Sequence, residues 1–150
     1  MDSSLAPQVA LITGAGQGIG QGIAYSLAKR GVRIVAVGRT LSKCEHTINE
    51  IANRYGVEGR ALACDIGDLE ALAALVENAV AVFGRLDILV NNAVSTTVKP
   101  LMKVKLDEFE QGLRVGPLAT LRMMQLVQPH LVQQGGGNII QISSATAKIM

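Results

Sequence analysis

A cluster of glycines near the start of the chain is the stretch best suited to chemistry. The sequence from Val9 to Leu27 begins as a short apolar run, passes through Gly14, Gly18 and Gly20, and resumes with helical periodicity. Glycine lets the backbone turn tightly and approach a pyrophosphate, whose charge is met by N–H groups and the dipole at the helix start. This order predicts a phosphate cradle for a dinucleotide. The alternative is a purely structural turn between a strand and a helix.

A second candidate site follows the next apolar run, at Gly38, Arg39 and Thr40. In a dinucleotide-binding sheet, an acidic residue here binds the adenosine ribose hydroxyls of NAD, whereas an arginine accommodates the 2′-phosphate of NADP. Gly38 is not acidic, and a guanidinium forms strong, geometrically suited bonds to phosphate. The segment therefore favours NADP(H) over NAD(H). The alternative is that Arg39 is an ordinary solvated side chain.

Five short apolar runs, separated by helical patterns, position these residues. We expect strands at Val9–Thr13, Arg33–Gly38, Arg60–Cys64, Asp87–Asn91 and Asn138–Ile142. Strands that alternate with helices favour a parallel sheet with right-handed crossovers. The predicted fold is α/β, a doubly wound parallel sheet of the Rossmann type with strand order 3-2-1-4-5. We expect residues 1–150 to form one dinucleotide-binding domain.

Apolar residues at helical spacing predict the buried face of each helix. The first three stripes are Ile19, Ile23 and Leu27; Cys44, Ile48, Ile51 and Tyr55; and Leu69, Leu72, Val76, Val80 and Phe83. A long fourth helix is expected from Leu106 to about Gln134, with core contacts at Phe109, Leu113, Leu121, Met124 and Leu131. Pro117 lies inside that helix and should kink it or break a backbone bond.

Composition excludes several classes of function. Of the 150 residues, 49% are apolar and 17% are charged, which is typical of a folded domain. A net charge of +2 without a basic cluster argues against nucleic-acid binding. We see no secretory signal and no run long enough to span a membrane. Cys44 and Cys64 lack metal-ligand or disulfide spacing, so we expect no metal, two half-buried free thiols and a cytoplasmic location.

Four motifs in order resemble those of the short-chain dehydrogenase/reductase family. The stretch T-G-A-G-Q-G-I-G at Thr13–Gly20 is similar to the family's T-G-x-x-x-G-I-G. Asp65 after the third strand, Asn91-Asn92-Ala93 after the fourth and I-S-S at Ile142–Ser144 after the fifth also match. The resemblance covers the whole chain. It implies the N-terminal part of a single-domain, NAD(H)- or NADP(H)-dependent oxidoreductase, with further strands outside this chain.

The resemblance also assigns residues to roles. Asp65 and the Ile66 backbone would contact adenine, and Ser144 would polarise the substrate oxygen because a hydroxyl both donates and accepts. Ser143 is the alternative to Ser144. The complete set of cofactor-binding residues expected is Gly14, Gln17, Gly18, Ile19, Gly20, Gly38, Arg39, Thr40, Asp65, Ile66, Asn92 and Ala93. Gln17 slightly weakens the case for NADP(H), since NADP-preferring members of the family often carry a second basic residue at the position of Gln17.

Three features depart from the family pattern. Val94 stands where the family usually has glycine, and Gly116 stands at the position of its proton-relay asparagine. The family's acid/base pair, Tyr-x-x-x-Lys, would lie beyond the serine and past the end of this chain. Tyr25 and Lys29 have the same spacing, but they lie on the helix that leads away from the glycine turn.

The resemblance implies an oxidoreductase that interconverts a carbonyl and a secondary alcohol, such as a 3-oxoacyl thioester or a similar ketone. We expect a small-molecule substrate, no nucleic-acid or membrane partner, and a homo-dimer or homo-tetramer. Two alternatives stay open: reduction of the carbon–carbon double bond of an enoyl thioester, and binding of NADP(H) without catalysis. Residues 1–150 alone are expected to be inactive, with the fifth strand as an exposed edge.

Overall fold

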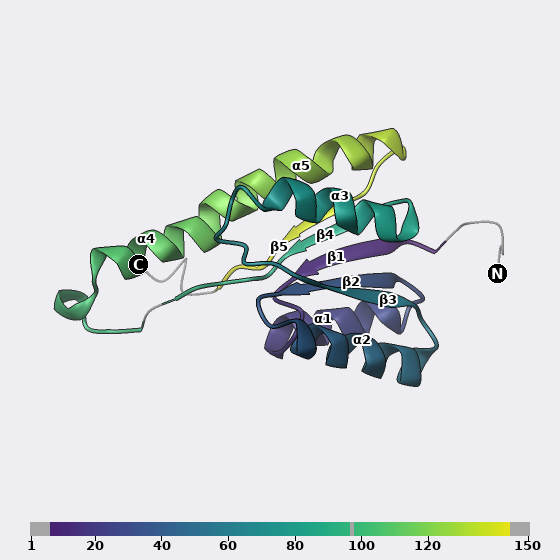
Figure 1. The fold of residues 1–150 in the computed structure, drawn as a ribbon, viewed down its shortest axis with the longest axis horizontal. Coiled ribbons are helices and arrows are strands. Elements are labelled where there is room, and N and C mark those ends of the chain that lie inside the picture. Colours follow the sequence, from purple (N-terminus) through teal and green to yellow (C-terminus); the bar gives the residue numbers. More distant parts are fainter. Residues whose placement is uncertain (1–6, 97, 145–150) are drawn as a thin grey trace.

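Five parallel strands form one sheet at the centre of the molecule (Figure 1). The computed structural model describes residues 7–96 and 98–144. The strands are β1 (Val9–Thr13), β2 (Arg33–Gly38), β3 (Gly59–Ala63), β4 (Ile88–Asn91) and β5 (Asn138–Gln141). Their order is β3-β2-β1-β4-β5, and each neighbouring pair is parallel. The predicted doubly wound α/β fold is confirmed, with strand boundaries within one residue of those expected.

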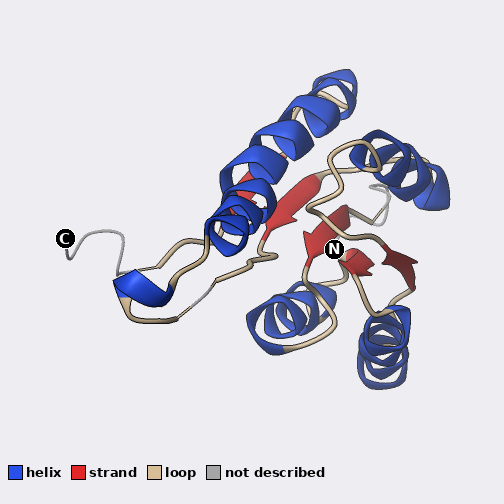
Figure 2. Ribbon diagram, turned by 60° about the vertical axis from the view of Figure 1, so that its left-hand side comes forward, coloured by secondary structure: helices blue, strands red, loops and turns tan. Residues whose placement is uncertain are grey.

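Helices cover both faces of the sheet. Figures 1 and 2 show α1 (Gly18–Ala28) and α2 (Leu41–Tyr55) on one face, with α3 (Leu72–Phe83) and α5 (Ala119–Gln133) on the other. A short 3-10 helix (Leu101–Lys103) and α4 (Leu106–Leu113) precede α5. Glycines in the left-handed region end two of these helices, Gly56 after α2 and Gly84 after α3. Within the described residues, no helix is both long and apolar enough to cross a membrane.

The core consists of two apolar layers separated by the sheet. Alternate residues of each strand point to opposite faces, so a strand covered on both faces is apolar throughout. Leu11 and Val35 pack in the layer under α3 and α5, whereas Ile12 and Ile34 pack in the layer under α1 and α2. All four side chains are fully buried. The apolar runs of β1, β2 and β4 therefore reflect burial from both sides, whereas β5 is exposed along its length.

The buried stripe of α1 differs from the predicted one. Gly20, Ala24 and Ala28 face the sheet, whereas Ile19 is 68% exposed and Ile23 is only partly buried. The helix starts so close to β1 that only residues with small side chains fit between them. On α2 the predicted stripe is right, with Cys44 and Ile51 fully buried and Ile48 and Tyr55 packed at their edge.

The predicted core contacts of the long fourth helix are mostly wrong. Phe109, Leu113 and Leu121 are 60%, 43% and 52% exposed, whereas Leu131 is buried and Met124 packs against the core as predicted. The other buried side chains of this segment are Val115, Ala119, Met123 and Val127. A π-helical turn at residues 114–118 lies between α4 and α5. Because a π-turn takes up an extra residue, it shifts the apolar stripe that follows it, which accounts for Leu121. Phe109 and Leu113 precede the turn, on α4, which has no buried residue. Pro117 lies inside this turn, so the local distortion expected from proline is present without a break in the helix.

A buried carboxylate joins the starts of β1 and β4. Asp87, only 4% exposed, accepts a hydrogen bond of 2.8 Å from the Val9 N–H and two from the Arg85 guanidinium, at 2.6 and 2.9 Å. The Val9 N–H lies at the buried end of the central strand, and the Asp87 carboxylate is its hydrogen-bond acceptor. The Asp87 interaction therefore fixes the amino-terminal edge of the sheet, opposite the edge that carries the motifs.

Removing this carboxylate should strongly destabilise the protein. Asp87→Ala leaves the buried Val9 N–H and the Arg85 guanidinium without their partner, so we expect the free energy of unfolding to fall by about 3 kcal/mol. Glu58→Ala is the matched control, because Glu58 pairs with Arg33 while 71% exposed and should cost less than about 0.5 kcal/mol. Urea unfolding monitored by circular dichroism measures both variants. Equal effects would contradict the anchoring role of Asp87.

Candidate functional site

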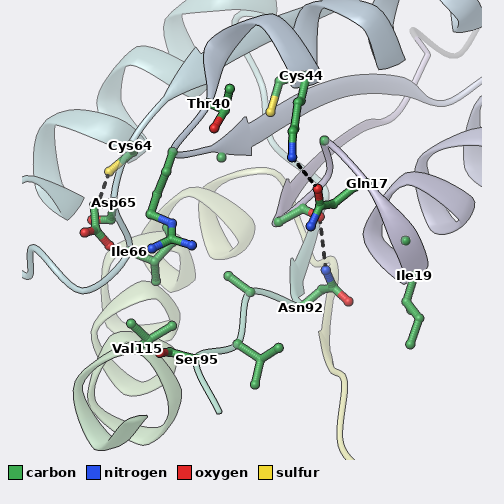
Figure 3. Close-up of a pocket in the computed structure, with 18 residues that line it drawn as sticks. Gln17, Ile19, Thr40, Cys44, Cys64, Asp65, Ile66, Asn92, Ser95 and Val115 are labelled. Atoms are coloured by element: carbon green, nitrogen blue, oxygen red, sulfur yellow. Dashed lines mark hydrogen bonds between the residues drawn. The ribbon is translucent and has the colours of Figure 1, made fainter. Parts of the chain in front are cut away.

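The carboxyl ends of β1–β4 meet at one edge of the sheet, where they form a cleft of about 360 Å³ (Figure 3). Gln17 and Asn92 lie on one side of the cleft, and Asp65 and Ile66 lie on the other. Parallel doubly wound sheets bind ligands at this edge. Every predicted cofactor-binding residue except Gly20 lines the cleft. Lining residues that sequence reasoning did not assign are Gly16, Lys43, Cys44, Cys64, Val94, Ser95 and Val115.

The glycine turn after β1 requires glycine at three positions. Gly14 and Gly18 adopt φ angles of +68° and +58°, which residues other than glycine rarely adopt. Gly20 has no such angle, but a Cβ atom built on it would lie 2.3 Å from the Gly14 carbonyl oxygen. Gly20 therefore serves the site from outside the cleft, because it allows the first turn of α1 to pack against the end of β1.

The start of α1 is free of the side chains that usually cap a helix. Gln17 occupies the N-cap position without a side-chain hydrogen bond to the helix, and the first turn contains no acidic residue. The first N–H groups of a helix lack intrahelical partners and carry the positive end of the dipole. These groups lie beside cleft-lining Gly18 and Ile19. Their geometry and charge fit a pyrophosphate.

Asn92 connects the loop after β4 to the glycine turn. Its Nδ2 donates to the carbonyl oxygens of Thr13 and Gly14, at 3.0 and 3.3 Å. The Thr13 hydroxyl oxygen in turn accepts hydrogen bonds of 2.9 Å from the backbone N–H groups of Asn92 and Ala93. Asn92 therefore lines the cleft and also holds the turn in place. The Thr13 hydroxyl is a positioning group that the sequence motif contained but did not explain.

The segment after β2 combines a steric and a charge feature. A Cβ atom on Gly38 would lie 2.9 Å from the Cys44 sulfur, so a carboxylate side chain has no room there unless the Cys44 side chain or α2 shifts. Arg39 is exposed and lines the cleft, as does Thr40. Within residues 7–96 and 98–144, Arg39 forms no ion pair with an acidic residue. Among the described residues, this end of the cleft therefore presents a guanidinium without an ion pair, beside the turn after β3 that carries Asp65.

The segment after β3 forms a tight turn next to the segment after β2, on the side of the cleft away from Gln17 and Asn92. An Asp65 carboxylate oxygen accepts a hydrogen bond of 2.9 Å from the Gly67 N–H, while Ile66 is buried beneath. Cys64 is half-buried, and Cys44 is fully buried rather than half-buried as expected. Burial raises the pKa of both thiols, and the nearby Glu45 raises that of Cys44 further. Both cysteines are therefore neutral wall residues at physiological pH.

The candidate catalytic residue lies near the cleft but not on its wall. Ser144 follows β5, whose pairing with β4 is extended by an Ile142 N–H bond of 3.0 Å to the Asn91 carbonyl oxygen. Gly116 lies in the π-turn beside cleft-lining Val115, and a Cβ atom on it would meet nothing within 4 Å. The role of Ser144 stays a prediction.

The Tyr25–Lys29 spacing does not mark a second site. The Arg54 guanidinium lies 5.3 Å from the centre of the Tyr25 ring, and the ring packs at the edge of the core layer under α1 and α2. Lys29 is the C-cap of α1. Neither residue lines the cleft. Packing accounts for Tyr25, as the position of this pair in the sequence suggested.

Two glycines on α1 offer an internal test of the turn geometry. Gly20→Ala places a methyl group against the Gly14 carbonyl, so we expect it to lower the free energy of unfolding by about 3 kcal/mol. Gly22→Ala meets no atom within 4 Å and should raise it by about 0.5–1 kcal/mol through helix propensity. Chemical denaturation measures both variants. Effects of the same sign would show that the close approach at Gly20 is not the controlling contact.

The Thr13 hydroxyl should be essential to the loop after β4. Thr13→Val keeps the shape of the side chain but leaves two N–H groups without an acceptor, at a cost of about 2–3 kcal/mol in the free energy of unfolding. Thr13→Ser keeps the oxygen and should cost less than about 1 kcal/mol. Urea unfolding distinguishes the two variants. If serine is as harmful as valine, the methyl packing rather than the hydroxyl carries the effect.

Comparison with known proteins identifies the family. The family model described as short chain dehydrogenase matches residues 8–150. D-threitol dehydrogenase of Mycolicibacterium smegmatis is 34% identical over 148 residues, which cover 99% of this chain and 56% of that protein. The chain belongs to the short-chain dehydrogenase family, and it spans about half the length of the curated relatives it matches.

Two solved structures have the same fold and hold different cofactors. A metagenomic short-chain oxidoreductase in complex with NADP has a TM-score of 0.86 and 37% identity, over 95% of this chain and 64% of that one. An NAD⁺-bound xylitol dehydrogenase has a TM-score of 0.88 and 28% identity. That match covers 94% of this chain and 54% of the other. The comparison therefore supports a nicotinamide-binding fold without deciding between NADP and NAD.

Proposed function

We propose that this chain contributes the cofactor-binding part of an oxidoreductase that uses NADP(H). The observation that carries the proposal is the cleft at the carboxyl edge of the sheet, which the Gly14–Gly20 turn lines together with the uncapped start of α1. Arg39 and the acid-free end of β2 favour a ribose 2′-phosphate. Relatives in this family bind both forms of the cofactor, so the preference for NADP(H) rests on the residues of this chain.

The whole protein is proposed to be longer than the present chain, with residues 1–150 as the N-terminal part of a single dinucleotide-binding domain. The match to only 56% of D-threitol dehydrogenase supports this. We propose that a Tyr-x-x-x-Lys pair downstream of Ser144 completes the acid/base machinery. Neighbouring positive charge lowers the pKa of a tyrosine and makes it a usable acid or base.

The proposed reaction interconverts a carbonyl and a secondary alcohol, with a 3-oxoacyl thioester or a similar ketone as substrate. A bound nicotinamide supplies hydride transfer, while the protein supplies binding and orientation. The turn at Gly14–Gly20 would hold the pyrophosphate, and Asp65 and Ile66 would flank the adenine. Ser144 would hydrogen-bond the reacting oxygen, which needs a group able both to donate and to accept.

Steady-state kinetics of the intact protein test this proposal. We expect NADPH oxidation with a ketone or a 3-oxoacyl thioester, and a lower kcat/KM with NADH. Ser144→Ala should lower kcat by about 100-fold, because it removes a hydrogen bond made to the developing charge. The Kd for NADPH should not change, since the serine lies outside the cofactor cleft.

Ser143→Ala is the matched control, because it removes a neighbouring exposed hydroxyl and should leave kcat within about threefold. Turnover of an enoyl thioester alone would instead indicate carbon–carbon double-bond reduction. Tight NADPH binding without turnover across the whole panel would indicate a non-catalytic binding protein. Either result would overturn the proposed reaction while leaving the cofactor site in place.

A further inference from the structure

A lysine from the first turn of α2 reaches across to the glycine turn. Lys43 Nζ donates a hydrogen bond of 2.7 Å to the Gln17 side-chain oxygen, although the two residues are 26 positions apart in sequence. Both side chains line the cleft. Figure 3 shows this bond as the dashed line at Gln17. The lysine therefore brings a cation to the glycine turn, at a position where the sequence itself supplies only a neutral amide.

Packing holds the backbone of Lys43 in this place. A Cβ atom on Gly16 would lie 2.9 Å from the Lys43 Cβ, so the start of α2 packs directly against the glycine turn. One helical turn further, fully buried Thr47 donates 3.0 Å to the Ala15 carbonyl oxygen and accepts 3.0 Å from Gln21 Nε2. The Thr47 bonds join α2 to both the turn and α1. The Lys43 side chain is exposed, but its point of attachment is fixed.

The charge of Lys43 is not neutralised in the part of the chain that the structure describes. Arg33, Arg54 and Lys99 each pair with a glutamate, whereas Lys43 and Arg39 appear in no ion pair there. Among the described residues, the Lys43 ammonium has one hydrogen-bond partner, the Gln17 side-chain oxygen, and that partner is uncharged. An ammonium has three donor hydrogens, so a bond to Gln17 leaves two for a ligand.

We propose that Lys43, positioned by Gln17, acts with Arg39 to select a dinucleotide with a phosphate on its adenosine ribose. The inference rests on the proposed function and extends it to a residue outside the sequence motifs. Lys43 is a specificity-determining residue that contacts the phosphate, and Gln17 is a positioning residue that acts through it. The amide at position 17 thus supports phosphate selection, although in the sequence it counted against NADP(H).

Isothermal titration calorimetry of the intact protein with NADP⁺ and NAD⁺ tests this role. The ratio of the two Kd values isolates the contribution of the 2′-phosphate, because all other contacts are shared. Lys43→Met should weaken NADP⁺ binding by about 10-fold, as expected for one charge-assisted contact. Binding of NAD⁺ should stay within about twofold. Lys43→Arg keeps the positive charge and should retain most of the NADP⁺ preference.

Two further variants separate this role from a general effect of charge or folding. Lys29→Met removes the same charge at the far end of α1, outside the cleft, and should leave the ratio unchanged. Gln17→Ala should weaken NADP⁺ binding by about threefold in the natural background and not at all when combined with Lys43→Met, because coupled residues are not additive. Additive losses would overturn the positioning role of Gln17.

Failure of this inference differs from failure of the proposed cofactor choice. A natural protein that binds NAD⁺ more tightly than NADP⁺ contradicts the cofactor choice, whatever the variants do. Lys43→Met that lowers both affinities equally, or neither, overturns the inference even where the natural protein prefers NADP⁺. A selective loss of NADP⁺ binding in Lys43→Met alone, with no loss in Lys29→Met, supports it.

Discussion

The close approach of α1 to the end of β1 is the constraint on which the cleft depends. The Gly14 carbonyl oxygen lies where a Cβ atom of residue 20 would be, and the Asn92 amide donates to that same oxygen. A larger residue at position 20 would separate the helix from the strand and also displace the loop after β4. One backbone contact therefore sets the relative positions of three elements. The N–H groups at the helix start face the cleft only while this contact is made.

The central strands β1, β2 and β4 were predictable because each is a short apolar run that is buried on both faces. The glycines that end α2 and α3 were predictable for the same local reason, since a left-handed residue follows the helix directly. The buried faces of α1 and of the α4–α5 helix were not. On α1 the proximity of β1 selects small residues over Ile19, and in the long helix the π-turn around Pro117 shifts the period. Both errors arise from packing that the hydrophobic pattern does not encode.

The cleft residues follow the same division. Gly38, Asp65 and Asn92 each come directly after a strand, and parallel strands bring such positions to a single edge, so the motif order predicts their meeting. Lys43 lies outside the four sequence motifs, and its contact with Gln17 depends on how α2 packs against the glycine turn. Gly16 allows this packing, because a Cβ atom on it would lie 2.9 Å from the Lys43 Cβ. That proximity is visible only in the structure, because the two residues are far apart in the sequence. The catalytic role of Ser144 stays a proposal, because the Tyr-x-x-x-Lys pair proposed to act with it is not in this chain.

The proposed preference for NADP(H) rests on shape as well as on charge at the end of β2. The Cys44 sulfur lies 2.9 Å from the position of a Cβ on Gly38, and Cys44 is fully buried between α2 and the sheet. An acidic side chain at position 38 would therefore need the fully buried Cys44 side chain or α2 to move, and α2 is joined to the glycine turn by the buried Thr47. The packing that excludes the acid also places Arg39 and Lys43 on the cleft. Steric exclusion of a carboxylate and the presentation of two cations are therefore consequences of one helix position.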